Sequence, residues 1–106
     1  MVLVKEMPDV FPPQKDASDC ELVRLVCVLN EQGLHARPAA NLAQTAQRFE
    51  ADVAIAMGAQ KVDAKSILDI LTLAAGHGAN LELRAKGHDA GAALDALADL
   101  FKNRFQ

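Results

Sequence analysis

The strongest constraint on the fold is an alternation between two apolar patterns that begins at residue 21. Short apolar runs of strand length are separated by longer segments whose apolar residues recur at three- and four-residue intervals. The first run, ELVRLVCVL at residues 21–29, is rich in valine and leucine and predicts a buried strand. Residues 36–49 then show helical spacing, and the stripe consists of Ala39, Leu42, Ala43, Ala46 and Phe49.

The middle of the chain continues the alternation with a hairpin and a second helix. ADVAIAM, at residues 51–57, predicts a short strand that reverses near Gly58 into a second strand around residues 61–64. Ser66 opens the second helix, and Gly76 is its predicted terminator. The predicted apolar face of this helix consists of Ile67, Ile70, Leu71 and Ala74.

The last third of the chain predicts one more strand and one more helix. NLELRAKG, at residues 80–87, alternates apolar and polar residues as a half-solvated strand does. Asp89 is the predicted cap of the final helix, whose stripe consists of Ala90, Leu94, Leu97, Phe101 and Phe105. The order β-α-β-β-α-β-α predicts an α+β open-faced β-sandwich. In this fold a four-stranded antiparallel or mixed sheet is covered on one face by three helices.

The first twenty residues differ from the rest. Pro8, Pro12 and Pro13 disfavour both a regular helix and a central strand. Residues 1–20 are therefore predicted to be an N-terminal extension, either mobile or packed through its short apolar tip. Residues 21–106 are long enough for one folded domain with a single core.

Composition argues against several function classes. A hydrophobic content of 51% and a mean hydropathy of +0.07 predict a soluble, folded protein. The net charge of -3 and the absence of Trp and Tyr argue against nucleic-acid binding. The chain shows neither a signal peptide nor a membrane-spanning run, so we expect no membrane insertion. Cys20 and Cys27 fit reduced thiols in a cytoplasmic protein.

GLHARPAA, at residues 33–40, is where the chain concentrates side chains capable of chemistry. It enters the first predicted helix, where backbone N–H groups lack intrahelical acceptors and attract anions. Pro38 fits the first helical turn, and the helix could begin at Ala36 or at Pro38. The guanidinium of Arg37 suits phosphate oxygens, and a neutral imidazole nitrogen of His35 can attack phosphorus. These residues together describe a site that could accept and hold a phosphoryl group.

A plainer interpretation of the same residues stays open. Histidines in loops are mostly solvated side chains without a task, and an arginine nearby is commonly a surface charge. Helix starts that favour anions are also frequent in folded proteins. The residues of the motif alone therefore do not decide between a phosphoryl site and an ordinary loop.

The motif resembles the active-site sequence of HPr, the histidine phosphocarrier family of the bacterial phosphotransferase system. Ser66, in AKSILDIL, stands thirty-one residues after His35 and is similar to the regulatory serine region of that family. AAGHGANLELRAKG resembles the family's loop and last strand, and ALDALADLF resembles its terminal helix. The resemblance covers residues 21–106.

The resemblance implies a monomeric phosphoryl carrier without a cofactor or a metal ion. Enzyme I, charged from phosphoenolpyruvate, would transfer a phosphoryl group to Nδ1 of His35, which would pass it to a histidine of an IIA protein or domain in sugar uptake. Arg37 would stabilise the phosphoryl oxygens, and the helix start at Ala36 and Pro38 would form the anion site. Such a protein is a stoichiometric carrier and not an enzyme in its own right.

Ser66 has two interpretations. With Asp69 three positions later it fits a capping box, which explains the serine without regulation. The resemblance implies a second use, phosphorylation by HPr kinase/phosphorylase, which would add negative charge to the docking surface. The acidic Asp69 departs from many relatives and puts the choice of partner in doubt.

The resemblance also implies contact with Enzyme I and IIA partners through the first two helices. The predicted partner-binding residues of the second helix are Ile67, Leu68 and Leu71. Leu68 lies about 100° from Ile67 on the helix, so it either widens the buried stripe or stays exposed as an apolar contact.

Two alternative functions stand beside sugar uptake. One is a regulatory, nitrogen-related phosphotransferase carrier. The other, from a different class, is a small ligand- or metal-binding α+β module. His77 and His88 are expected to be solvent-exposed loop residues, and no close-spaced pair supports a metal site that they would form with His35.

Overall fold

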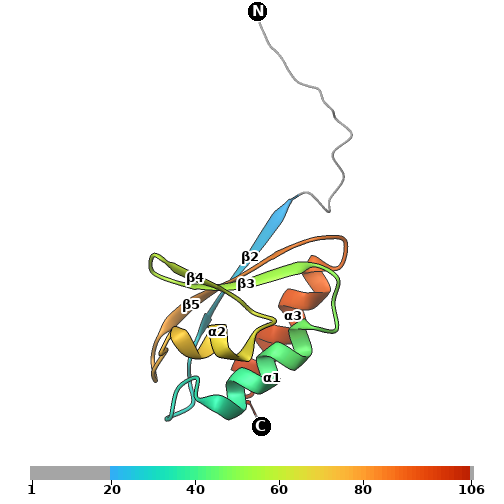
Figure 1. The fold of residues 1–106 in the computed structure, drawn as a ribbon. Helices are drawn as coiled ribbons and strands as arrows, with labels where there is room; N and C mark the ends of the chain where they lie inside the picture. The colour runs from blue at the N-terminus through green and yellow to red at the C-terminus, as the bar shows by residue number, and fades with distance from the viewer. Residues whose placement is uncertain (1–19, 106) are drawn as a thin grey trace, which may run out of the picture.

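The computed structural model describes residues 20–105, and this part of the chain contains the predicted elements in the predicted order (Figure 1). The expectation for an N-terminal extension falls almost entirely on residues 1–19, outside the described residues. The elements are β2 (Glu21–Cys27), α1 (Ala36–Ala46), β3 (Asp52–Met57), β4 (Gln60–Asp63), α2 (Ile67–Thr72), β5 (Asn80–Lys86) and α3 (Ala90–Lys102).

The four strands form one antiparallel sheet in the order β2-β5-β3-β4. Only β3 and β4 are joined by a hairpin, while β5 lies between β2 and β3 and pairs with both. All three helices lie on the same face of this sheet (Figure 1). The predicted open-faced α+β sandwich is therefore confirmed, with an entirely antiparallel sheet.

The core lies between the sheet and the helices and contains no buried polar or charged residue among those described. Alternation along the central strand β5 turns Leu81, Leu83 and Ala85 toward the helices. The largest fully buried side chains are Leu42, Ile55, Ile70, Leu81, Leu83, Leu97 and Val28.

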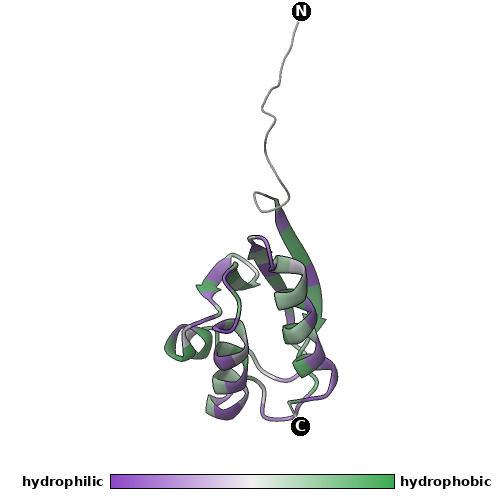
Figure 2. Ribbon diagram, turned by 90° about the vertical axis from the view of Figure 1, so that its right-hand side faces the viewer, coloured by the Kyte–Doolittle hydropathy of each residue, from purple (hydrophilic) through white to green (hydrophobic). Residues whose placement is uncertain are grey.

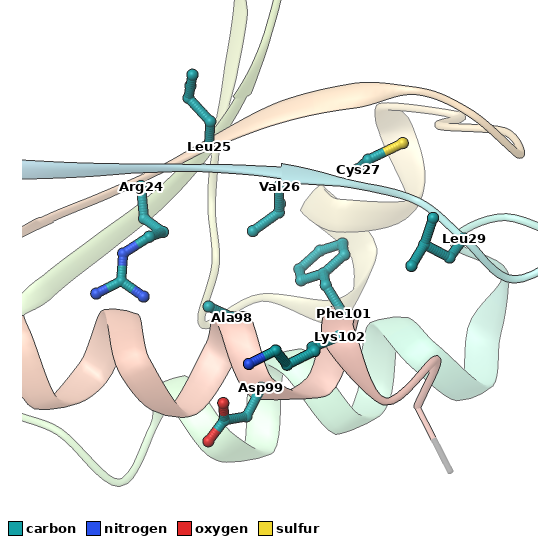
Figure 3. A pocket seen from close by; sticks show the side chains of 9 residues that line it. All are labelled: Arg24, Leu25, Val26, Cys27, Leu29, Ala98, Asp99, Phe101 and Lys102. Carbon is teal, nitrogen blue, oxygen red and sulfur yellow. The ribbon is translucent and has the colours of Figure 1, made fainter.

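The prediction that the first strand is buried was wrong. Val23 and Leu25 are 50% and 73% exposed, because β2 is an edge strand and no helix covers its outer face. Arg24 and Val26 point toward α3, whereas Leu25 and Cys27 point away from it (Figure 3). In Figure 2 the strand that continues from the grey trace carries both hydrophilic and hydrophobic bands. The valine and leucine content identified a strand but not its burial.

The ends of the first two helices also differ from the prediction. The first helix ends at Ala46, and Phe49 lies half-buried beyond it instead of inside the helical stripe. The second helix ends at Thr72, well before Gly76. Ala74, with φ 50°, already leaves the helical conformation.

The predicted apolar face of the second helix was only partly correct. Ile70 is fully buried and Leu71 is half-buried against the core. Ile67 and Ala74 are exposed. A helix of only six residues presents few positions to the core, so the ends of the predicted stripe reach solvent.

Asp89 occupies the predicted cap position of α3, but its carboxylate bonds elsewhere. It makes no side-chain hydrogen bond to its own helix. Instead, its two oxygens accept hydrogen bonds from the backbone N–H groups of Glu50 (2.9 Å) and Ala51 (2.8 Å). These bonds, that from Glu50 above all, hold the pKa of Asp89 below its usual value. The residue therefore ties the start of α3 to the start of β3.

Phe105 was predicted on the stripe of the last helix and lies beyond its end. α3 ends at Lys102, and Phe105 has φ 61°.

None of the helices within residues 20–105 is long and apolar enough to cross a membrane.

Candidate functional site

A tight turn delivers the chain into the first helix. The backbone N–H of Gly33 donates to the carbonyl of Asn30 (3.1 Å), and Nδ2 of Asn30 donates to the carbonyl of Gly33. Gly33 has φ 70° and packs so closely on the loop after α2 that a Cβ atom would lie 2.5 Å from the carbonyl oxygen of Ala75. The N–H of Leu34 then donates to that same carbonyl (2.9 Å). The position of His35 is thereby fixed from a distant segment of the chain.

His35 is the N-cap residue of α1, with extended backbone angles. Its imidazole makes no capping hydrogen bond, and the first turn contains no acidic residue. The helix begins at Ala36, which decides the open choice between Ala36 and Pro38. The first helical hydrogen bond runs from the N–H of Ala39 to the carbonyl of His35 (3.0 Å).

The amides ahead of that bond have no intrahelical acceptor. They belong to His35, Ala36 and Arg37, while Pro38, at the third helical position, has no N–H to satisfy. These free amides and the helix dipole create a partial positive charge beside the imidazole. The start of α1 therefore has the unpaired donors and the partial positive charge that attract an anion, and the imidazole of His35 lies at its edge.

An open cavity of about 560 Å³ lies in front of this helix start. His35 and Arg37 are exposed in it, and Pro38 forms part of its buried wall. Its lining residues are Leu29, Asn30, Glu31, Gln32, His35, Arg37, Pro38, Arg104 and Phe105. The structure thus brings three of the residues predicted from GLHARPAA to one cavity.

Arg104 and Phe105 were missed by the sequence reasoning. They follow the last helix, and no local pattern connects them with a loop near residue 30. The described segment after α3 lies beside the first half of α1 (Figure 1). The only sequence clue was the phenylalanine itself, which was assigned to the helical stripe.

Ser66 lies at the start of α2, whereas the cavity lies at the start of α1. It is the N-cap residue of α2, and its hydroxyl oxygen accepts a hydrogen bond from the N–H of Asp69 (3.2 Å). The predicted capping interaction is thus confirmed. Ser66 is half-buried and does not line the cavity that contains His35.

The predicted partner-binding residues also lie on α2, which runs beside α1 (Figure 1). Leu68 is 75% exposed and Ile67 is 38% exposed. Leu71 is half-buried against the core. Leu68 therefore does not widen the buried stripe but is an exposed apolar side chain.

The remaining histidines stay apart from the site. His77 is exposed in the loop before β5, and the exposed His88 lies 3.8 Å from a carboxylate oxygen of Glu50. Within residues 20–105 no group of three or more His, Cys, Asp or Glu side chains is arranged to hold a metal ion.

Comparison with known proteins assigns the family. Residues 23–103 match the family model described as "PTS HPr component phosphorylation site". The chain belongs to the HPr family. It is 45% identical over 85 residues to phosphocarrier protein HPr of Treponema pallidum, covering 80% of this chain and 97% of that protein. It is 44% identical over 85 residues to phosphocarrier protein NPr of Shewanella violacea, covering 80% and 93%.

Solved HPr structures share the fold. An HPr of Thermoanaerobacter tengcongensis superposes with a TM-score of 0.77 at 38% identity, covering 79% of this chain and 94% of that one. An HPr of Bacillus anthracis gives 0.74 at 41% identity, covering 78% and 99%. This HPr-family chain is thus a phosphocarrier of the phosphotransferase system.

Proposed function

We propose that His35 is the phosphoryl acceptor of this carrier. Enzyme I, charged from phosphoenolpyruvate, donates the group, and a histidine of an IIA protein or domain receives it during sugar uptake. The observation that carries the proposal is the start of α1, where the exposed imidazole of His35 makes no capping hydrogen bond and lies beside free amides and Arg37. Each chain carries one phosphoryl group from donor to acceptor, so the protein is a stoichiometric carrier and not an enzyme in its own right. It acts as a cytoplasmic monomer.

The transfer needs one nucleophile and compensation for negative charge. Nδ1 of His35 attacks phosphorus, a P–N bond forms, and the bond from phosphorus to the donor breaks with its electron pair. The guanidinium of Arg37 and the amides of Ala36 and Arg37 donate hydrogen bonds to the phosphoryl oxygens. Transfer to IIA repeats the exchange with His35 as the leaving group. An exposed site serves both steps, because two large partners must reach the same nitrogen.

The direct test incubates the chain with phosphoenolpyruvate and Enzyme I and measures an acid-labile phosphoryl adduct by mass spectrometry. We expect one adduct on the wild-type chain and none on His35→Ala. His77→Ala and His88→Ala are matched controls, since each removes an exposed imidazole away from the cavity. No adduct with several Enzyme I homologues, or an adduct that survives in His35→Ala, would contradict the proposal.

Arg37 is tested in the same assay by its kinetics. Arg37→Gln should lower the rate of phosphoryl transfer by about tenfold, because one charge-assisted pair of hydrogen bonds is lost. Arg48, an exposed arginine further along the chain, provides the control Arg48→Gln for the loss of one positive charge. An unchanged rate in Arg37→Gln would remove Arg37 from the proposed site.

We further propose that Ser66 is a regulatory phosphorylation site for HPr kinase/phosphorylase. A phosphate there would stand at the start of α2, beside Asp69 and the exposed apolar Leu68. It would add about -1.5 to -2 charges. That charge would oppose docking of partners on Ile67, Leu68 and Leu71 without melting the helix. Incubation with ATP and the kinase, with Ser66→Ala as the control, tests this; label that persists in Ser66→Ala would contradict it.

A nitrogen-related carrier is the second candidate function, favoured by the 44% identity to an NPr. Both functions use His35 in the same way and differ in the partner that charges it. Parallel assays with a sugar-branch and a nitrogen-branch Enzyme I distinguish them through the ratio of their kcat/KM values. A ratio that favours the nitrogen-branch enzyme by about tenfold or more would replace sugar uptake as the proposed pathway.

A further inference from the structure

The cavity in front of His35 receives a second arginine from the far end of the chain. Arg37 comes from the first turn of α1, and Arg104 comes from the segment after α3. Both side chains are exposed, and within residues 20–105 neither forms an ion pair. Among the lining residues that the structure describes, Glu31 carries the one side-chain carboxylate. The cavity is therefore more cationic than the motif around His35 alone provides.

The placement of Arg104 depends on how α3 ends. The N–H of Phe105 donates to the carbonyl of Leu100 (2.8 Å), and the N–H of Arg104 donates to the carbonyl of Phe101 (3.1 Å). This pair of bonds is the Schellman arrangement, in which the residue after the cap is left-handed and usually glycine. Here that position is Arg104, with φ 56°. The chain keeps a long cationic side chain where its backbone favours glycine.

Phe105 holds this arrangement against the core. Its ring meets the ring of the buried Phe101 edge-on, with centroids 5.0 Å apart. It also forms part of the cavity wall beside Arg37. The segment from Arg104 to Phe105 is thus packed in place, and Arg104 lines the cavity from a backbone position that these contacts hold.

We propose that Arg104 is a second phosphate-binding residue of the His35 site and contacts the phosphoryl group once it is bound to the imidazole. The inference rests on the proposed function of His35 and adds a residue to it. Two guanidinium groups from segments far apart along the chain then share the charge of one phosphoryl group, since each can donate two hydrogen bonds to its oxygens. Arg104 supports the phosphorylated state, while His35 alone performs the attack.

The test uses the full chain and a donor that needs no partner protein. Phosphoramidate phosphorylates histidines directly: the imidazole nitrogen forms the P–N bond as ammonia leaves. A His77→Ala/His88→Ala background confines the product to His35. The measurement is the second pKa of the phosphoryl group, followed by ³¹P NMR across pH.

We expect Arg104→Gln to raise the pKa of the phosphoryl group relative to the parent chain, because a nearby cation favours the dianion. Arg104→Gly should raise the pKa equally while keeping or increasing resistance to denaturant, since glycine suits the left-handed position. Loss of the arginine is thereby separated from loss of structure. In the Enzyme I assay, both variants should show transfer rates reduced by about threefold to tenfold.

Lys102→Gln is the matched control. Lys102 ends the same helix, and its substitution removes the same charge. Its side chain lines a different hollow, between β2 and α3 (Figure 3). We expect its phosphoryl pKa and transfer rate to equal those of the parent chain. An unchanged pKa in both Arg104 variants, or an equal rise in Lys102→Gln, would overturn the inference.

The two proposals fail separately. Failure of Enzyme I to phosphorylate the wild-type chain contradicts the carrier function but leaves the phosphoramidate measurement to decide on Arg104. Normal phosphorylation of the chain with no effect of Arg104→Gln contradicts only the role of Arg104. A His35 that phosphoramidate cannot modify contradicts an anion-binding cavity and overturns the inference.

Discussion

The starts of α1 and α2 differ in how the backbone N–H groups of their first turns are satisfied. At α2, Ser66 supplies a hydroxyl that accepts from the N–H of Asp69, and the first turn carries that acidic side chain. At α1, His35 occupies the same cap position without a capping bond, and the first turn has no acid. One helix satisfies its own N-terminus, whereas the other leaves it open to an external anion.

This difference shows a cost of function within the fold. A serine, threonine, aspartate or asparagine at the cap of α1 would stabilise the helix by about 1 kcal/mol relative to a non-capping residue. The chain uses such a capping bond at α2 but not at α1. The uncapped start gives up local stability and retains a place where a phosphoryl group can replace the missing cap.

His35→Ser should have the largest effect, because it makes the start of α1 resemble that of α2. The proposed function predicts complete loss of phosphoryl acceptance from Enzyme I. The new hydroxyl should also raise the free energy of unfolding by about 1 kcal/mol relative to His35→Ala. Urea denaturation measures the stability, and the acid-labile adduct measures the activity. Equal stabilities of the two variants would show that the α1 start gains nothing from a cap.

Gly33→Ala should disturb the entry to α1 while leaving α2 capped. The added Cβ would lie 2.5 Å from the carbonyl oxygen of Ala75, so the turn before His35 must move. We expect a loss of about 2 to 4 kcal/mol in unfolding free energy and slower phosphoryl transfer.

Gly78→Ala is the matched control for Gly33→Ala. Gly78 also has a positive φ, 87°, but open space surrounds the added atom. The unfolding free energy of Gly78→Ala should fall by only about 1 kcal/mol, and its rate of phosphoryl transfer should not change. Similar losses in both variants would mean that backbone conformation, and not contact with Ala75, fixes the turn.

Ser66→Ala tests the satisfied helix start. Removing the hydroxyl leaves the N–H of Asp69 without its acceptor and should lower the unfolding free energy by about 1 kcal/mol. Ser66→Asp retains a capping oxygen and should restore most of this stability. Phosphoryl acceptance at His35 should not change in Ser66→Ala, since Ser66 lies outside its cavity. A large loss of acceptance would couple the two helix starts more strongly than their separation predicts.

Asp89 should give the smallest effect, visible mainly in acid. Its carboxylate caps the start of another element, through the N–H groups of Glu50 and Ala51. Hydrogen bonds from these groups lower its folded pKa below the unfolded value near 3.8. Its contribution to stability is therefore present above that value and is lost as pH falls through the folded pKa.

The variant Asp89→Asn isolates that contribution. The difference in unfolding free energy between wild type and Asp89→Asn should be constant near neutral pH and shrink below about pH 4. Thermal unfolding at a series of pH values measures it. A difference that grows toward low pH would contradict the sign of the pKa shift.

Local patterns predicted the elements and their order well. Helical spacing placed α1 and α3, and residues next to one another in sequence placed His35 at a helix start and Ser66 at a cap. These features depend on hydrogen bonds and side chains within about four positions along the chain. The predicted ends of the first two helices were less accurate than their positions. The helices end earlier, at Ala46 and Thr72, because packing sets where a short helix stops.

The sequence by itself determined the alternation of strands and helices, the motif that identifies the HPr family and the position of His35 before a proline-containing first turn. Only the tertiary structure decided that β2 is an exposed edge, that Asp89 serves β3, and that Arg104 enters the cavity of His35. Each of the latter depends on contacts between segments far apart along the chain. Periodicity reports which face of an element is apolar, but it carries no information about which distant segment covers that face or leaves it open to solvent.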